Sequence, residues 1–166
     1  MTPAKLLTDS FDRILEGGLA AVDGLSEDQL AHRLSPEANS IAWLIWHLTR
    51  VQDDHIADAA GLQQVWAADG FEEDFALDLP ADDTGFGHSA EQVGLVRASS
   101  EQLAAYLTRT HRQSVAWVGG LAEEDLDRVV DTNWDPPVTL GVRLVSVIND
   151  DTQHLGQAAY LRGLLG

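Results

Sequence analysis

The sequence has no cysteine among its 166 residues. Disulfide bonds, thiolate metal ligands and a protein thiol nucleophile are therefore all excluded. The N-terminal segment, MTPAKLLTDSFDR, also lacks the charged and then apolar pattern of a secretory signal. With no sign of export and no disulfide, we expect a cytoplasmic protein.

Basic residues are scarce. Lys and Arg together number 10 against 27 Asp and Glu, which gives a formal net charge of −17. A surface of this sign repels a phosphate backbone and an anionic membrane surface, so neither is expected as a partner. We attribute the charge to solubility, and it says little about a substrate.

Long apolar runs are missing as well. The longest uninterrupted one is IAWLIW at 41–46, far short of the roughly 20 residues that a membrane span needs. The apolar fraction of 45% is ordinary for a globular protein. A chain of 166 residues can form one domain with a proper core and leaves little length for a second. We expect a single domain over residues 1–166 that has no membrane segment.

Four segments show apolar residues at helical spacing, and none of them shows the alternation of a strand. The first two expected helices cover residues 3–23 and 39–60, the second capped by Asn39 or Ser40 and followed by Gly61.

The third expected helix opens at Ser89, which forms a capping-box pattern with Gln92, and runs to Gly119 and Gly120. The fourth begins near Thr139, after two prolines that a helix interior would not tolerate. Residues 61–88, rich in Gly and Asp, then form a long connection. The pattern predicts an all-α fold, a four-helix bundle with one long crossover between its second and third helices.

The last expected helix carries polar residues within an apolar face. Steps of three and four place Asp150 and His154 on one stripe, one turn apart and about 6 Å along the axis. The other members of this stripe are Leu140, Leu144, Val147, Ala158 and Leu161. A carboxylate on such a face is costly unless it is paired or coordinated. The i, i+4 spacing also lets two helical side chains converge on one metal ion.

A third ligand is available in the second expected helix. His47 lies within a stretch that is apolar almost all round, so this helix should be the most buried one. His47, Asp150 and His154 would form a two-histidine, one-carboxylate set. Such a set suits zinc or nickel first, and iron and manganese also accept it. Three protein ligands leave coordination positions open, which is typical of a catalytic metal site.

Other residues compete for these roles. Asp151 is an alternative to Asp150, and only the i, i+4 spacing favours Asp150. His55 lies two turns beyond His47, about 12 Å along the axis, too far to share its ion. The remaining histidines are expected at the surface or as hydrogen-bonded core residues: His32, His88 and His111. No residue stands out as a general base beyond the metal ligands.

The candidate substrate-binding residues are Trp46, Arg50 and Trp134. Large aromatic side chains near a metal commonly line a pocket, and a cation there could meet an anionic substrate. For Trp43 and Trp46 we favour the alternative of a core position. For Arg50 we favour an ion pair with Asp53 or Asp54.

Two segments, NSIAWLIWHLTRVQDD and TLGVRLVSVINDDTQHLGQAAYLRGLL, resemble the signature helices of the DinB-like proteins. That superfamily includes the YfiT-type proteins, regarded as metal-dependent hydrolases, and the mycothiol-dependent maleylpyruvate isomerase group. The resemblance extends over essentially the whole chain. It includes the pattern ligand–x–x–x–His–x–Gly–Gln, here Asp150, His154, Gly156 and Gln157.

The resemblance implies a four-helix bundle with a divalent metal on three ligands, commonly three histidines. The isomerase-type branch has two histidines and a glutamate, and this chain resembles it with the shorter Asp150 at the carboxylate position. The resemblance also suggests a homodimer.

The resemblance further implies that the metal activates a low-molecular-weight thiol such as mycothiol, which attacks a small electrophile. A divalent cation lowers the pKa of a bound thiol or water, which fits this chemistry. The chain ends at Gly166, where the maleylpyruvate enzymes carry a further domain, which counts against that substrate. We expect a thiol-dependent S-transferase or isomerase. The alternatives are a metal-dependent hydrolase, a non-haem iron oxygenase, and a metal- or small-molecule-binding bundle without catalysis.

Overall fold

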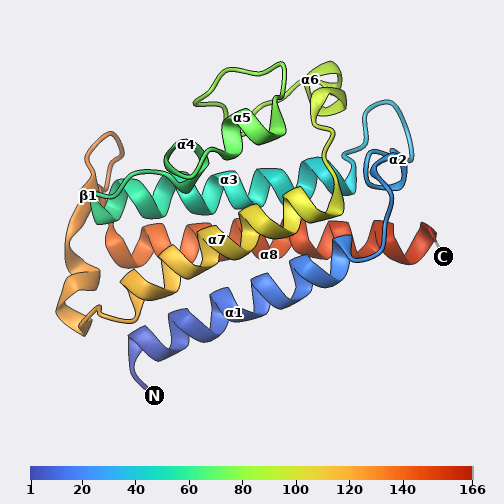
Figure 1. Cartoon of the computed structure of the whole chain (residues 1–166). Coiled ribbons are helices and arrows are strands. Elements are labelled where there is room, and N and C mark those ends of the chain that lie inside the picture. Colours follow the sequence, from blue (N-terminus) through green and yellow to red (C-terminus); the bar gives the residue numbers. More distant parts are fainter. Residues whose placement is uncertain (166) are drawn as a thin grey trace.

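Helices dominate the computed structural model, which describes residues 1–165, and the all-α class is confirmed. Four long helices lie side by side: α1 (Pro3–Val22), α3 (Ile41–Ala60), α7 (Ser100–Val118) and α8 (Leu140–Leu165) (Figure 1). Helix α3 packs on α8 and α7, and α1 packs on the same two helices. The strongest of these contacts is between α3 and α8, which therefore define the interface at which side chains from the two helices can meet.

The ends of the long helices follow from local sequence. Thr2, Ser40 and Ser99 each accept a hydrogen bond from the backbone N–H three residues on, which satisfies a donor that the first turn leaves unpaired. Gly61 ends α3 at φ +66°, a left-handed conformation that glycine adopts without a steric penalty. The predicted bounds of the first two long helices are confirmed to within a residue or two.

The prediction of one continuous third helix is wrong. It is divided into α6 (Ala90–Leu95) and α7, and Val96 between them is extended at φ −81° and ψ 95°. The capping box of Ser89 and Gln92 exists, but it opens the short α6. A second capping box at Ser99 opens α7. The break is stabilised by burial, because the side chain of Val96 within it is only 1% exposed.

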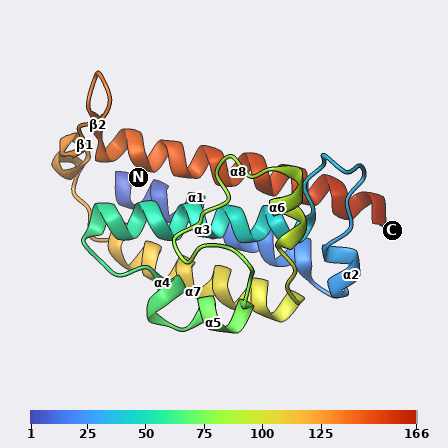
Figure 2. The ribbon, with the colours of Figure 1, turned by 90° about the horizontal axis from the view of Figure 1, so that it is seen from above.

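The connection between α3 and α6 contains two short helices, α4 (Val65–Ala68) and α5 (Phe71–Phe75). It crosses the outer side of α3, and its short helices reach α7 (Figure 2). The carboxylate of Asp53 on α3 anchors it by accepting the backbone N–H groups that open α4, each at 2.8 Å. The rest of this connection, residues 76–89, returns along α3.

Three small elements complete the fold: α2 (Glu27–Leu30), the 3₁₀ helix η1 (Glu123–Asp127) and a hairpin of β1 (Val129–Asp131) and β2 (Val138–Thr139). The sequence analysis expected no strand, and this antiparallel hairpin lies outside the four expected helices, directly before α8. Arg143 on α8 holds it through a 2.8 Å contact with Asp131.

The core centres on α3, which is the most buried helix, as predicted. Helix α8 contributes the apolar residues of the expected stripe: Leu140, Leu144, Val147 and Ala158. Among residues 1–165, no helix combines the length and the hydropathy that crossing a membrane requires.

Candidate metal centre

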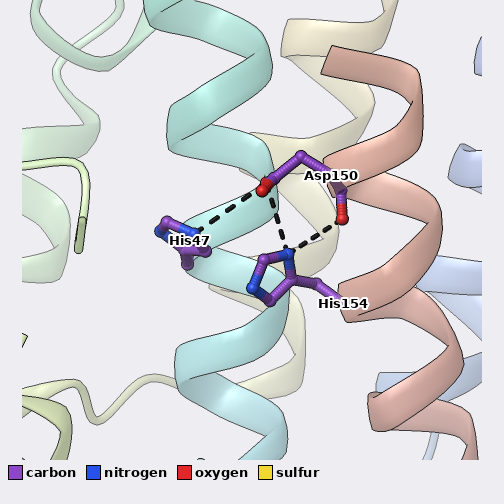
Figure 3. A group of neighbouring side chains, drawn as sticks. All are labelled: His47, Asp150 and His154. Carbon is purple, nitrogen blue, oxygen red and sulfur yellow. Dashed lines mark hydrogen bonds and ion pairs between the residues drawn. The ribbon is translucent and has the colours of Figure 1, made fainter. Parts of the chain in front are cut away.

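Three side chains meet at the interface of α3 and α8, namely His47 from α3 and Asp150 and His154 from α8 (Figure 3). Each offers one ligand atom, and these atoms all lie within 4.8 Å of one another. His47 Nε2 lies 3.9 Å from Asp150 Oδ2, and His154 Nδ1 lies 3.2 Å from the same oxygen. The structure thus brings together the three residues that the sequence analysis selected.

The imidazole of His47 is held in one orientation. Its Nδ1 donates a hydrogen bond to the backbone carbonyl of Thr84, so the lone pair lies on Nε2, the nitrogen that faces Asp150. Its ring stacks on Trp43, with centroids 4.5 Å apart and an interplanar angle of 15°. The residue is only 5% exposed, so this nitrogen would act as a neutral ligand from a buried position.

Helix α8 orients the other two side chains. His154 Nδ1 donates to the backbone carbonyl of Asp150 at 2.8 Å, one turn earlier. The side chain of Asp150 is 36% exposed, yet its Oδ2 is buried and has no hydrogen-bond partner in the part of the chain that the structure describes. A carboxylate oxygen aimed at two imidazoles without a proper donor is the kind of orphaned acceptor that a cation would satisfy.

The charges of the cluster are coupled. Burial opposes ionisation of Asp150, but the close contact with His154 and the charges of His154, His47 and His55 outweigh it and lower the pKa of Asp150. Burial likewise disfavours the charged form of His154, but Asp150 raises the pKa of His154 above its usual value. For His47 burial dominates, so its pKa is lowered. The cluster therefore contains an ionised carboxylate beside a buried, neutral imidazole.

Asp151 has a different environment from Asp150. It is 0% exposed, neither carboxylate oxygen has a hydrogen-bond partner within residues 1–165, and it is not part of the three-residue cluster. Burial, and then the charge of Asp150, raise the pKa of Asp151 well above its usual value. The geometry therefore groups Asp150 rather than Asp151 with the two histidines.

The donor set suits a transition metal. Two imidazole nitrogens and one carboxylate oxygen are ligands that zinc, nickel, iron and manganese accept, whereas calcium and magnesium prefer oxygen alone. The three residues leave room in the coordination sphere for a further molecule, as catalytic sites do. The cluster could hold such an ion.

The sequence analysis missed a loop that supports this cluster, residues 83–88. Trp43 Nε1 donates to His88 Nδ1 at 3.1 Å, and His88 Nε2 lies 2.9 Å from Asp83 Oδ2. His88 therefore uses both ring nitrogens within the fold, in agreement with its expected role as a hydrogen-bonded core residue. The spacing along the chain gives no signal for this contact, because 45 residues separate Trp43 from His88.

The candidate substrate-binding residues lie in three different environments. Trp46 is 1% exposed, in agreement with the core position that we favoured. Arg50 is 0% exposed and lies 3.7 Å from Asp53, so the favoured ion pair is confirmed. Trp134, in the loop that joins β1 to β2, is 66% exposed. A role in substrate binding stays a prediction for all three residues.

A known protein family and a known structure each match almost the whole chain. The family model described as Mycothiol-S-transferase matches residues 6–166. A crystal structure described as that of a conserved protein from Enterococcus faecalis is similar, with a TM-score of 0.90 and 32% sequence identity. The similarity covers 98% of this chain and 96% of that chain. Among curated proteins, none matches the chain.

Proposed function

Because the chain belongs to the mycothiol-S-transferase family, we propose that it is a metal-dependent enzyme that transfers a low-molecular-weight thiol to a small electrophile. Membership of this family confirms the DinB-like resemblance that the sequence analysis identified. The thiol that we propose is mycothiol, and the partners are small molecules.

The cluster of His47, Asp150 and His154 is the observation that carries this proposal. A divalent ion held there would lower the pKa of a thiol and so supply a nucleophile at neutral pH. The chain has no cysteine of its own, so the sulfur nucleophile has to come from an external molecule. This requirement fits the family to which the chain belongs.

The protein's own residues have defined tasks in this proposal. His47 supplies a neutral nitrogen from the most buried helix, and its ring cannot turn freely while Nδ1 is bonded to Thr84. Asp150 supplies the negative charge, and its partly exposed side chain lies on the side from which a small molecule can approach. Trp43 covers the face of the His47 ring and excludes water from it.

Membership of the family also supports proposals about the architecture, the assembly and the metal. We propose that the four long helices form a four-helix bundle, that residues 1–166 are one domain, and that two copies form a homodimer. Zinc or nickel is the metal that we propose. The exposed Trp134 is the remaining aromatic candidate for contact with a substrate, since Trp46 is enclosed by the core.

The first test is the metal content of tag-free protein, measured by inductively coupled plasma mass spectrometry. We expect about one equivalent of a divalent transition metal in the wild type and a loss of that metal in His154→Ala, because one of three ligands is removed. His111→Ala is the matched control, since His111 pairs with Asp12 between α7 and α1 and is not one of the three cluster residues. That variant should keep its metal.

The second test measures transfer of thiol to a chlorobimane electrophile, followed by fluorescence, with mycothiol present and absent. Turnover that needs both metal and mycothiol supports the proposal. Failure of the wild type to bind metal after incubation with zinc or nickel would overturn it. Metal-dependent turnover of an ester that does not need thiol, with no transfer to the bimane, would assign the site to hydrolysis instead.

A further inference from the structure

His47 differs from the other two cluster residues in how it is oriented. Asp150 and His154 lie one turn apart on α8, and His154 is fixed by a carbonyl of its own helix. His47 is the sole contribution of α3, and its hydrogen-bond acceptor is Thr84, which lies 37 residues away in the loop 83–88. The orientation of His47 thus depends on a segment outside the two helices that form the site.

We propose that Trp43, His88 and Asp83 form a positioning chain that holds the His47 imidazole with Nε2 facing Asp150. The proposal rests on the proposed function in one respect, namely that the cluster binds a metal. It assigns a role to three residues that are not ligands themselves.

The first link of the chain is the stacked pair of rings. Trp43 lies one turn before His47 on α3, and the two rings are nearly parallel at 15°, with centroids 4.5 Å apart. The indole therefore blocks rotation of the imidazole out of its plane. The same indole also lies beside His154 in a T-shaped arrangement, with ring centroids 5.9 Å apart, so Trp43 contacts both histidines.

The second link fixes the indole. Its Nε1 donates to His88 Nδ1 at 3.1 Å. An indole N–H can only donate, so His88 Nδ1 must be the unprotonated nitrogen, and the ring proton lies on Nε2. That nitrogen donates to Asp83 Oδ2 at 2.9 Å. The donors therefore run in one direction, from Trp43 to His88 to Asp83, and each has a matched acceptor.

The third link anchors Asp83 and returns to His47. Asp83 Oδ1 accepts the backbone N–H of Gly85 at 2.7 Å, and the carbonyl of Asp83 accepts Arg50 Nε at 3.0 Å. The residue between Asp83 and Gly85 is Thr84, whose carbonyl accepts the Nδ1 proton of His47. One short loop thus fixes both the plane of the imidazole and its tautomer.

The loop approaches the imidazole as closely as a backbone can. Gly85 has φ +90°, and a Cβ placed on it would lie 2.8 Å from His47 Nδ1 and 3.0 Å from Trp46 Cζ3. Only glycine satisfies both the conformation and the space at this position. A loop that merely covered the core would not require this contact with the imidazole of a candidate metal ligand, on the nitrogen opposite the one that faces Asp150.

Trp46 shows that the hydrogen bond of Trp43 is not a general property of tryptophan on this helix. Trp46 is equally part of α3, is 1% exposed, and stacks on His88 with centroids 5.9 Å apart. Its Nε1 nevertheless has no hydrogen-bond partner among the described residues. Both indoles pack against His88, and among the described residues only Trp43, which stacks on His47, donates a hydrogen bond to it. Trp46→Phe is therefore a matched control for Trp43→Phe.

Trp43→Phe retains an aromatic ring beside His47 and removes the N–H that fixes its plane. We expect zinc affinity, measured by competition with a chromophoric chelator, to fall by about 10-fold, the lower end of the usual effect of outer-shell partners. Trp46→Phe should stay within about 2-fold of the wild type, because no hydrogen bond is lost. His88→Phe, which removes the acceptor, should match Trp43→Phe.

The double variant Trp43→Phe/His88→Phe should lose no more zinc affinity than either single variant. The reason is that residues of one positioning chain act as a unit, so their effects do not add. In addition, long-range ¹H–¹⁵N correlation spectra of the metal-free proteins report the tautomer of His47. We expect a single Nδ1–H tautomer in the wild type and in Trp46→Phe, and a mixture in Trp43→Phe and His88→Phe.

Equal zinc affinity and an equal His47 tautomer in Trp43→Phe and Trp46→Phe would overturn the positioning chain, as would fully additive effects of Trp43→Phe and His88→Phe. Circular dichroism of the metal-free variants separates these results from unfolding, and His88→Phe provides a second variant if Trp43→Phe does not fold. Failure of the proposed function is distinguishable, because the tautomer of His47 can be measured even in a protein that binds no metal.

Discussion

Two adjacent aspartates, Asp150 and Asp151, have opposite environments on α8, and this difference leads to a prediction for each. Asp150→Asn removes the negative charge of the cluster. We therefore expect zinc affinity to fall by about 100-fold or more, because loss of a residue that merely supports a ligand already lowers affinity by up to about 100-fold. Asp151→Asn keeps the shape of a buried side chain that is outside the cluster. Its zinc affinity should stay within about 3-fold of the wild type. Chelator competition measures both.

The opposite pattern, with affinity lost in Asp151→Asn and kept in Asp150→Asn, would assign the ligand role to Asp151. Urea unfolding of both metal-free variants provides the control for folding. For Asp151→Asn no loss of unfolding free energy is expected from missing hydrogen bonds, because neither oxygen of Asp151 makes one with any of the described residues.

For individual residues, the sequence could predict the three members of the cluster but not the loop contacts that orient His47. The i, i+4 spacing of Asp150 and His154 and the apolar surroundings of His47 are local features that a helix converts directly into geometry. The contacts of His47 with Thr84, and of Trp43 with His88, span 37 and 45 residues and depend on the path of the crossover. No helical or strand period encodes such a path.

Among the helices, the closeness of α1 to α7 can be tested at Gly18. A Cβ on Gly18 would lie 2.4 Å from Leu107 Cδ2 on α7, closer than real contacts allow. We expect Gly18→Ala to lower the unfolding free energy by about 1–3 kcal/mol through overpacking. For Gly156 on α8, no atom of the described residues outside its own stretch of helix lies within 4 Å of an added Cβ, so Gly156→Ala should raise that free energy by about 0.5–1 kcal/mol through helix propensity.

Urea unfolding with a common m-value measures both glycine variants. A stabilised Gly18→Ala would mean that Leu107 takes another rotamer at little cost, so that α1 and α7 are not limited by this contact. Both substitutions replace a helical glycine by alanine, so both gain the same helix propensity. The difference between their unfolding free energies therefore measures the cost of overpacking at Gly18.

The boundaries of the helices also show where sequence patterns suffice. The predicted capping box of Ser89 and Gln92 exists, and the same pattern recurs at Ser99 and Gln102, inside what was expected to be one helix. The sequence does contain that second signal, and it correctly separates α6 from α7. The hairpin before α8 gives a weaker signal, because its strands are only three and two residues long.

For the whole molecule, the position of the cluster predicts that metal binding stabilises the fold. The ligands join α3 to α8, two helices that are distant in the sequence and form the most extensive helix pair. An ion that binds only the native arrangement stabilises it by about 2.7 kcal/mol at a free concentration 100 times Kd. For a chain of this length that corresponds to a rise in Tm of roughly 5–10 °C.

Differential scanning calorimetry with zinc and with a chelator measures this rise. His154→Ala should show no rise, while His111→Ala should show the full one, since its side chain pairs with Asp12 away from the cluster. Because the net charge of −17 attracts cations over the whole surface, an equal rise in all three proteins would show that zinc acts at other acidic groups. A rise confined to the wild type and His111→Ala requires that the stabilising ion binds at His154, in the cluster between α3 and α8.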